Sequence, residues 1–521
     1  MNKTIEKNMT AFTLFVSMII LLPILFFPIA TDTAIFIQAG KIIANGGVPY
    51  VDFIDIKPPI IYYIYAFICN IFGSSEFGIH LFDYMIQLLT AFLLYKLVSK
   101  YTLSKSTAFW STIVYSIIYT VLGHNQTMQV ESYVPILTMG MITLSLNDDR
   151  KYLKIFLVGI LAGFITGLKF TMGVIIFYQL FFDILSGERR MGVLLRRSLF
   201  FVSGFVLSAF ISFIPLIVYP SAREGFQNVY YYLSIYSQST IFGNVLRDSL
   251  KAVAEIFGDK LSLLLTITIF LGLSRSLKVS DKEDNTNKMN SSSFIILILL
   301  SISVMIEKKY FLYHFSRLFS VYSIYAGIGL TYIIRTFNSN WKNSLLNKGI
   351  IVSTLVFLLL LSPVPRWINL LAPSYYFLTD KQSYYNYYNR EDTQAILLKE
   401  HKTVADFAKS NTKPGEKVMV ISIASSIINY YIGERADTKY LLSCFYINSI
   451  EIPLWRSEAF SDLSHATILV MQTNDPTPIA NGHAFTSYEY MMTSSFFSDY
   501  IKSSFIPVFD TPHFRIYHRK V

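Results

Sequence analysis

Residues 31–59 read TDTAIFIQAGKIIANGGVPYVDFIDIKPP, and they follow directly on the first apolar segment of the chain. Apolar residues at helical spacing from Ile35 to Ile43 predict a short amphipathic helix, and Gly46-Gly47 is typical of its end. We expect this helix to lie on the bilayer surface, because the stretch is too polar to cross lipid and an aromatic run typical of a membrane interface follows it. The boundary between water and lipid would then hold four of its charged residues: Asp32, Asp52, Asp55 and Lys57.

The composition predicts an α-helical polytopic membrane protein. Of the 521 residues, 53% are hydrophobic and only 15% are charged, whereas a soluble chain of this length would divide into several domains with polar surfaces. The net charge of +10 could indicate a nucleic-acid partner. However, the basic residues cluster in short loops between apolar segments, as membrane orientation requires, so we expect membrane lipids and no nucleic acid as partners. The two cysteines, Cys69 and Cys444, form no disulfide framework or metal-ligand spacing.

The apolar segments predict about eleven transmembrane helices, a cytoplasmic N-terminus and an extracytoplasmic C-terminal part. Residues 60–72 are apolar but short, which is typical of an interfacial or re-entrant segment. The segment at 153–185 is broken near Lys169 into two helices that meet outside. Residues 220–257 are expected to form an external loop rich in tyrosine. The spans are expected near residues 10–30, 77–95, 107–122, from after the external turn that ends at Glu131 to about 146, 153–185 (two helices), 198–219, 258–274, 293–306, 317–334 and 349–363.

Two domains are expected. Residues 1–366, with the first external loop at 31–59, would form the transmembrane domain. Residues 367–521 are less apolar and would form a soluble extracytoplasmic α/β domain, because a helical pattern alternates with strand-like runs. The helix is expected at Glu391–Ser410, and the strands at Lys417–Ile423, Ala466–Gln472 and Phe514–Tyr517. The sequence contains no nucleotide-binding glycine loop and no internal repeat.

Charged residues in the predicted external loops point to a site. Ionisable groups at membrane depth are costly, and by default they mark function. Lysines neutralise phosphate, and a carboxylate accepts a proton from a hydroxyl, so the set suits a phosphorylated lipid substrate. The cations are Lys57, Lys169, Lys308, Lys309 and Arg317; the acids are Asp32, Asp52, Asp55, Glu131 and Glu307.

Several motifs occur in a fixed order: Asp32 at the start of the first loop, Gly47-Val48-Pro49-Tyr50, Lys57-Pro58-Pro59, Phe72-Gly73, Glu131, and Lys309 to His314. This pattern resembles the GT-C superfamily of integral-membrane glycosyltransferases. It is most similar to the branch that contains protein O-mannosyltransferases and the aminoarabinose transferase of lipid A. This branch resembles glycosyltransferase family 39. Relatives often have Asp-Glu where this chain has Asp32-Thr33.

The resemblance implies a GT-C fold and transfer of a sugar from a polyprenyl-phosphate-linked donor to an acceptor hydroxyl on the outer face, with inversion. The acceptor could be a glycan, a lipid or a protein. The resemblance makes Asp32 the general base and gives Glu131 the task of orienting the acceptor or the sugar. Donor phosphate binding is implied for Lys57, Lys308, Lys309, His314 and Arg317. Further candidates are Asp52, Asp55 and Lys169. No cofactor is expected to be required, although the acids Asp32, Asp52, Asp55 and Glu131 could hold a divalent cation.

Simpler roles compete with these. Asp32 could cap its helix, Lys57 could extend to the lipid headgroups, and Lys169 or His314 could be interfacial anchors. Two other functions also stay open. A flippase or transporter of lipid-linked sugars would predict repeated halves and polar residues at the bilayer midplane. A polymerase of lipid-linked cell-surface glycans, or an oligosaccharyltransferase using pyrophosphate-linked donors, would carry similar loops.

Overall fold

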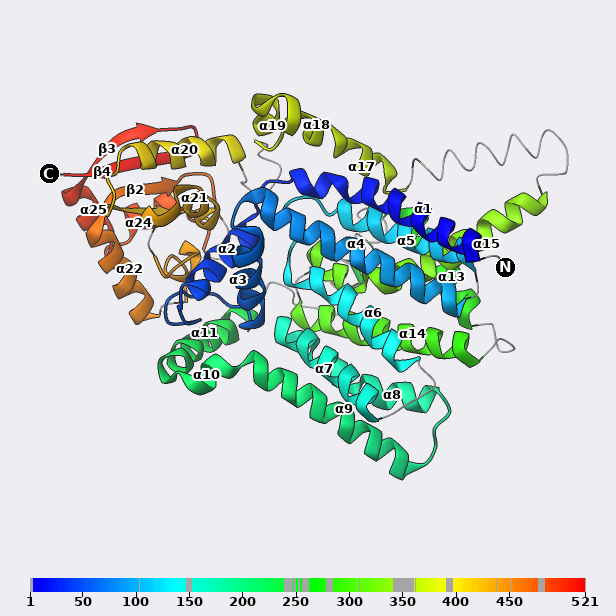
Figure 1. The fold of residues 1–521 in the computed structure, drawn as a ribbon. Coiled ribbons are helices and arrows are strands. Elements are labelled where there is room, and N and C mark those ends of the chain that lie inside the picture. Colours follow the sequence, from blue (N-terminus) through cyan, green and yellow to red (C-terminus); the bar gives the residue numbers. More distant parts are fainter. Residues whose placement is uncertain are drawn as a thin grey trace. The chain divides into compact units, whose positions relative to one another are not determined.

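The protein divides into two compact units, which Figure 1 shows in a computed structural model. The first unit comprises Met1–Phe27, Ile79–Phe213 and Phe242–Ala372, and the second comprises Pro28–Gly78, Ile214–Ile241 and Pro373–Val521. The structure describes residues 3–102, 104–146, 152–238, 247, 250–251, 254, 262–277, 284–308, 310–340, 360, 362–389, 397–436, 438–450, 452–476 and 483–520.

The first unit is helical. Five helices in the described part of the chain are long and apolar enough to cross a membrane, at Asn8–Phe26, Glu76–Tyr101, Met191–Ser212, Thr286–Glu307 and Leu312–Phe337. Shorter apolar helices accompany them, so the prediction of a multi-pass helical membrane protein is confirmed. The number eleven stays a prediction, because most of the expected span at 349–363 lies outside the described residues.

The elements of this unit follow one another along the chain, and each expected span that lies mainly in the described residues overlaps at least one of them. They are α1 (Lys3–Leu21), η1 (Leu22–Phe26), α4 (Glu76–Tyr101), α5 (Lys105–Thr120), η2 (Val130–Tyr133), α6 (Val134–Ser145), α7 (Tyr152–Leu168), η3 (Phe170–Phe177), α8 (Tyr178–Leu185), α9 (Met191–Ser212), α13 (Leu263–Leu277), α14 (Asp284–Glu307), η5 (Leu312–Leu318), α15 (Phe319–Asn340) and α17 (Val364–Asn369).

Small residues let helices of this unit pack closely. On α7, a Cβ atom at Gly159 would lie 2.0 Å from the carbonyl oxygen of Phe201 on α9, so only glycine fits there. A Cβ at Gly204 of α9 would lie 2.1 Å from the carbonyl oxygen of Phe156 on α7. Helix pairs in lipid associate through such close backbone approaches, because apolar burial alone does not drive them together.

The predicted break near Lys169 is confirmed. Helix α7 ends at Leu168, and Lys169 adopts an extended backbone before the 3₁₀ segment η3 begins. The chain then returns through η3 and α8. Because of the break, Lys169 lies outside the regular helix, and its side chain can reach other segments.

The second unit contains a four-stranded sheet in the order β1-β2-β4-β3. The strands are β1 (Lys417–Ile421), β2 (Ala466–Gln472), β3 (Phe505–Asp510) and β4 (Phe514–Arg519). Strands β1 and β2 pair in parallel, and the other pairs are antiparallel. The sheet packs against helices α20 (Leu398–Ser410) and α21 (Ser425–Ile432) around a core that includes Val404, Val420 and Val470. Figure 1 shows α20 beside the sheet.

The three strands and the helix predicted for this region are confirmed, although residues 391–396 of the expected helix lie outside the described part. Strand β3 was missed because Pro507 interrupts its pattern; proline is tolerated there because β3 is an edge strand. The prediction of a loop after Pro220 was wrong for residues 220–238, because they form helix α11 (Pro220–Gln238). Its Tyr232 is buried against Phe445 and Trp455.

The remaining elements of the second unit are α2 (Thr31–Ala44), α3 (Ile60–Phe72), α10 (Ile214–Val218), α18 (Leu371–Thr379), α19 (Lys381–Tyr387), η6 (Gly433–Arg435), η7 (Ser443–Phe445), α22 (Pro453–His465), α24 (Ser487–Thr493) and α25 (Ser498–Ser504).

Residues 31–59, which the sequence led us to place in the transmembrane domain, pack within this second unit. The predicted amphipathic helix is confirmed as α2, which ends two residues before Gly46. Its Gln38 side chain donates a hydrogen bond of 2.9 Å to the carbonyl of Ser426 on α21. Further along the loop, the backbone N–H of Ile54 donates to the carbonyl of Lys439 at 2.8 Å. The first loop is therefore anchored to the C-terminal part of the chain.

Candidate functional site

A buried cluster of opposite charges lies in the first unit. The Lys169 ammonium is 2.6 Å from Glu131 Oε1 and 2.7 Å from Glu307 Oε2. The Arg317 guanidinium, through Nη2, is 2.8 Å from Glu131 Oε1 and 2.7 Å from Glu307 Oε1. His314 Nδ1 lies 3.2 Å from Glu307 Oε2. We call these five residues the ion-pair cluster.

Three 3₁₀ segments and one helix end bring the cluster together. Glu131 lies on η2, Lys169 immediately precedes η3, and His314 and Arg317 lie on η5. Glu307 is the last residue of α14. Irregular helical turns of this kind are frequent at functional positions, because they direct side chains that a regular helix would place elsewhere.

Hydroxyl groups complete the contacts of the cluster. Thr171 Oγ1 donates to Glu307 Oε1 at 2.6 Å, and Arg317 Nη1 donates to Ser303 Oγ at 2.7 Å. Sequence reasoning missed both residues, because a serine or threonine in an apolar segment carries no distinct signal. Glu307 was recognised as an external acid but was given no role, although a carboxylate at the end of an apolar span was the available signal.

The cluster balances its charges within a buried site. Glu131 and Arg317 are both fully buried, and Lys169 is 17% exposed. Burial alone would raise the pKa of Glu131, but Lys169 and Arg317 outweigh it and hold that pKa below its usual range. Buried charges are tolerated only when they are paired and hydrogen-bonded. The two carboxylates, one lysine and one arginine meet that condition.

The ligand atoms of Glu131, Glu307 and His314 lie within 4.8 Å of one another, which is close enough to hold a divalent cation. The sequence had instead grouped Glu131 with Asp32, Asp52 and Asp55, which belong to the second unit. In the described arrangement Lys169 and Arg317 already neutralise both glutamates. A cation bound there would have to share these carboxylates with them.

The second unit holds the other sequence-predicted group, which we call the acid–lysine loop (Asp32, Asp52, Asp55 and Lys57). Lys57 Nζ lies 4.0 Å from Asp32 Oδ2. Asp32 is in the first turn of α2, whose N-cap is Ala30, and its side chain is 30% exposed. Asp32 is therefore not the N-cap residue, and its carboxylate is accessible to a substrate.

Two buried tyrosines fix the backbone that carries Lys57. The hydroxyls of Tyr50 and Tyr62 donate to the carbonyl of Lys57 at 2.7 and 3.1 Å. The Tyr62 hydroxyl shares its single hydrogen between this carbonyl and Asp55 Oδ2, which lies closer at 2.8 Å, and the N–H of Ile56 donates to Asp55 Oδ1 at 2.7 Å. Burial is the main cause that raises the pKa of Asp55. These contacts indicate that Asp55 positions the loop.

Asp52 makes a local contact of the same kind. It accepts a hydrogen bond of 2.6 Å from the N–H of Val48, across a turn in which Tyr50 has a φ of 66°. A tyrosine in the left-handed region is strained, so the turn needs such support.

Of the remaining predicted phosphate ligands, Lys308 follows α14 in a left-handed conformation, with a φ of 53°, and Lys309 lies outside the described residues.

A buried polar network holds the segment that carries Glu131. Asp83, within α4, accepts hydrogen bonds from Tyr119 on α5 at 2.8 and 3.0 Å and from Gln87 at 2.8 Å. The Tyr119 oxygen accepts from the N–H of Met128 at 3.3 Å, and Met128 has a φ of 59°. The network thus fixes a strained residue three positions before Glu131.

Replacing Tyr119 by Phe is expected to lower stability by about 1–3 kcal/mol, because the buried Asp83 carboxylate would lose a donor. We also expect slower turnover, because the segment leading to Glu131 would lose its support. The measurements are thermal unfolding in detergent and turnover of the purified protein. Tyr84→Phe is the matched control, since Tyr84 is next to Asp83 on α4 and its hydroxyl donates to the carbonyl of Met18 at 3.2 Å, outside the network. Equal effects of both substitutions would contradict a role for the network.

These features define a class: the chain has the fold of the integral-membrane glycosyltransferases of the GT-C type. Residues 56–219 match the family model described as dolichyl-phosphate-mannose-protein mannosyltransferase. That range includes Lys57, Glu131 and Lys169. No curated protein matches the sequence.

Two solved structures carry the fold comparison. The chain is similar to ArnT from Cupriavidus metallidurans bound to undecaprenyl phosphate, with a TM-score of 0.59 and 13% identity over 99% of this chain and 98% of ArnT. The apo form of the same enzyme gives a TM-score of 0.56 and 12% identity at the same coverage. The resemblance to GT-C membrane glycosyltransferases expected from the sequence is therefore confirmed.

Proposed function

We propose that the chain is a membrane glycosyltransferase that moves a sugar from a polyprenyl-phosphate-linked donor to an acceptor hydroxyl on the outer face of the membrane, with inversion. The family match over residues 56–219 is the observation that carries this proposal, because it names a transferase with a dolichyl-phosphate donor. The likeness to ArnT bound to undecaprenyl phosphate adds support from the fold. The family model is that of a transferase, which favours transfer over a flippase or a polymerase.

Asp32 is the proposed general base. Its accessible carboxylate takes the proton of the acceptor hydroxyl, and that oxygen forms a bond to the anomeric carbon. The bond from the anomeric carbon to the phosphate oxygen breaks on the opposite face, and polyprenyl phosphate leaves with the electron pair. Attack opposite to the leaving group inverts the configuration at the anomeric carbon.

Lys57 is the proposed ligand of the donor phosphate. Its carbonyl is held by two tyrosine hydroxyls, so the backbone from which its ammonium extends is fixed. A fixed cation stabilises charge that develops on a leaving phosphate without reorganisation at the moment of reaction. Lys308, Lys309 and His314 remain further candidates. Arg317 bonds to two carboxylates and a serine, so we assign it to holding the ion-pair cluster.

Glu131 is proposed to orient a hydroxyl of the sugar or the acceptor. Its Oε1 atom receives both Lys169 and Arg317. Its buried Oε2 atom has no hydrogen-bond partner among the described residues. A buried acceptor without a donor is costly, so a substrate hydroxyl that donates to Oε2 would gain binding energy. Lys169, whose side chain is 17% exposed, stays a further candidate for the site.

The proposed orientation places the N-terminus in the cytoplasm and the C-terminal α/β domain outside.

The test of the function is mass spectrometry of polyprenyl lipids from cells that lack this protein, with and without rescue by the wild-type gene. We expect a polyprenyl-phosphate sugar to accumulate in the null strain and to clear on rescue, and its mass would identify the sugar. An unchanged lipid pool in both strains, together with no transfer by purified protein, would contradict the proposal. Accumulation of a pyrophosphate-linked sugar would favour the oligosaccharyltransferase or polymerase alternative.

A further inference from the structure

A polar pocket lies among the helix ends of the first unit, apart from the residues of the ion-pair cluster. Its volume is about 420 Å³. Its lining comes from the end of α4 and the start of α5, from the last turns of α13, from the first turns of α14 and from the second half of α15. Helix α15 packs against both α5 and α13. We call this cavity the arginine pocket, because Arg275 and Arg335 line it.

The two arginines of this pocket have no carboxylate partner in the described part of the chain. Both are exposed, and the Arg275 guanidinium stacks on the ring of Tyr332 at 3.8 Å. Tyr332 and Arg335 are three residues apart on α15, so they share one face of that helix. Among the described residues, neither arginine forms an ion pair and the lining contains no acid. Like charges beside one cavity repel each other, and a bound anion would relieve that repulsion.

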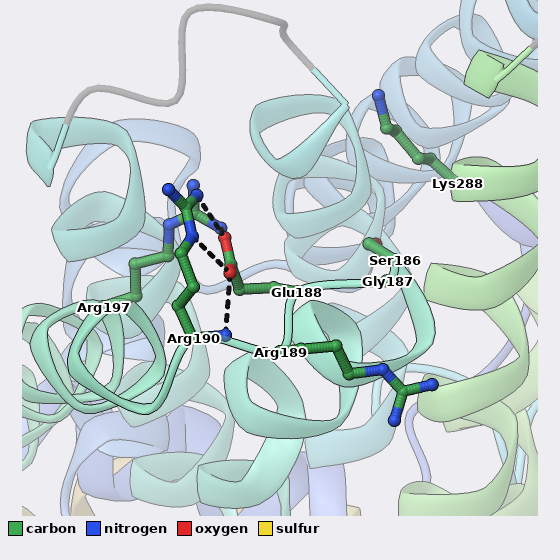
Figure 2. Close-up of a pocket in the computed structure, with 7 residues that line it drawn as sticks. All are labelled: Ser186, Gly187, Glu188, Arg189, Arg190, Arg197 and Lys288. Carbon is green, nitrogen blue, oxygen red and sulfur yellow. Dashed lines mark hydrogen bonds and ion pairs between the residues drawn. The ribbon is translucent and has the colours of Figure 1, made fainter.

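A second pocket, which Figure 2 shows, differs because its arginines are already paired. Arg190 Nε lies 3.0 Å from Glu188 Oε1, and these two side chains meet in Figure 2. Arg197, which also lines that pocket, has its Nη1 atom 3.0 Å from Asp183 Oδ1. These carboxylates occupy the N–H donors that a phosphate would need. The arginine pocket, where such pairs are absent among the described residues, is therefore the stronger candidate for binding an anion.

Two buried polar atoms of the arginine pocket also lack a partner. Thr331 is 4% exposed, and its Oγ1 atom has no hydrogen-bond partner among the described residues. The same is true of Asn290 Oδ1, whereas Nδ2 of that amide donates to the carbonyl of Ser276 at 3.5 Å. The threonine hydroxyl can donate to a phosphate oxygen, but the amide oxygen can only accept. Together the two atoms suit a phosphate ester that also carries a free hydroxyl group.

The position of the pocket along α14 suits a membrane lipid. Asn290 lies near the start of this helix, and Glu307 of the ion-pair cluster is its last residue. At about 1.5 Å per residue, the two are separated by about 26 Å along the helix. The hydrocarbon core of a bilayer is about 30 Å thick. The cluster and the arginine pocket therefore fit the headgroup levels of opposite leaflets, and in the proposed orientation the pocket is at the cytoplasmic leaflet.

Helix α13 offers a surface for the chains of such a lipid. Leu263, Ile267 and Phe270 recur at helical spacing, so they share one face, and all three are exposed. Acyl chains along this face would place the headgroup at the level of the last turn of α13, which carries Arg275. A soluble phosphate ester would gain nothing from the apolar face, so the observations favour a lipid.

We propose that the arginine pocket binds a phosphate ester with a free hydroxyl group, supplied by the headgroup of an anionic membrane lipid. Arg275, Arg335 and Thr331 donate to the phosphate oxygens, and a headgroup hydroxyl donates to Asn290 Oδ1. Basic pockets between membrane helices recognise anionic lipids on the cytoplasmic side in this manner. The site is separate from the proposed sugar transfer, so neither proposal depends on the other.

The test uses the full chain purified in detergent and native mass spectrometry with phosphatidylglycerol, phosphatidylcholine or glycerol 1-phosphate as the probe. Wild type is expected to retain phosphatidylglycerol in preference to phosphatidylcholine, whose zwitterionic headgroup has a phosphate but no hydroxyl. The variant Arg275→Gln/Arg335→Gln is expected to lose at least about tenfold in phosphatidylglycerol affinity, because each cation near the membrane surface adds to binding. Thermal unfolding of the lipid-free variant is expected to match that of wild type, since both arginines are exposed.

Arg189→Gln is the matched control. Arg189 is also exposed and lines the pocket in Figure 2, but it does not line the arginine pocket. A second variant, Thr331→Val, keeps the shape of the side chain and removes only its hydroxyl. It is expected to bind phosphatidylglycerol several-fold more weakly, in line with the loss of one hydrogen bond to a charged group.

The outcomes separate the proposal from its alternatives. An equal loss in Arg189→Gln, or no loss in the double arginine variant, would overturn it. Equal retention of phosphatidylcholine and phosphatidylglycerol by wild type would overturn the recognition of charge and hydroxyl. Displacement of phosphatidylglycerol by millimolar glycerol 1-phosphate would overturn the lipid as the source and assign the pocket to a soluble phosphate ester.

Discussion

Replacing Asp32 by Asn is expected to slow sugar transfer about 10²–10⁴-fold, because the amide cannot accept the proton of the acceptor hydroxyl. The fold should persist. Asp32 is 30% exposed and its contact with Lys57 is long, at 4.0 Å, so loss of the pair should cost less than about 1 kcal/mol. The measurement is turnover of the purified enzyme, together with accumulation of the donor lipid in cells that carry only the variant.

Asp52→Asn is the matched control for this substitution. Asp52 is on the same loop, is exposed, and accepts a hydrogen bond from the N–H of Val48, which an asparagine oxygen can also accept. Turnover of this control is expected to stay within about threefold of wild type, as for a positioned but non-reacting group. If Asp32→Asn clears the donor lipid as well as wild type does, Asp32 is not the base, even though the chain keeps its GT-C fold.

Local patterns allowed much of the fold to be predicted from the sequence. The break at Lys169 was visible because a charged residue interrupts an apolar run that is too long for one span. Helix α2 and three of the four strands followed from their periodicity. Helix α11 was missed because its many tyrosines and polar residues resemble a loop; its Tyr232 packs against Phe445 and Trp455, which lie far along the chain.

The candidate site shows the same limit. Sequence reasoning identified Glu131, Lys169 and Arg317 as charged residues of external loops, and His314 as part of a motif. It did not show that they pair, because Glu131 and Arg317 are 186 positions apart and no periodicity relates them. It also favoured an interfacial anchor over a ligand as the role of Lys169. The contacts of Lys169 with Glu131 and Glu307 at 2.6 and 2.7 Å favour a place in the site.

The ion-pair cluster supports the second large prediction. Arg317→Met is expected to destabilise the protein by about 3–5 kcal/mol, because two buried carboxylates would then share Lys169 as their main counter-charge. Turnover should fall with it, since Glu131 would no longer be held from two sides. Arg317→Lys should retain part of the stability but lose the geometry of the guanidinium, which bonds both glutamates and Ser303.

A double substitution tests whether the loss of charge balance is what destabilises Arg317→Met. In Glu131→Gln/Arg317→Met one carboxylate and one lysine remain, so the cluster is again neutral. This double variant is expected to be more stable than Arg317→Met alone, although it removes more native contacts. The measurement is thermal unfolding in detergent of four proteins: the wild type, both single variants and the double variant. Comparison of the four gives the coupling energy between Glu131 and Arg317. Arg275→Met is the control, because Arg275 is exposed and stacks on Tyr332 at 3.8 Å. Additive effects of the two single substitutions would show that packing around the arginine, and not the compensation of buried charge, stabilises this part of the fold.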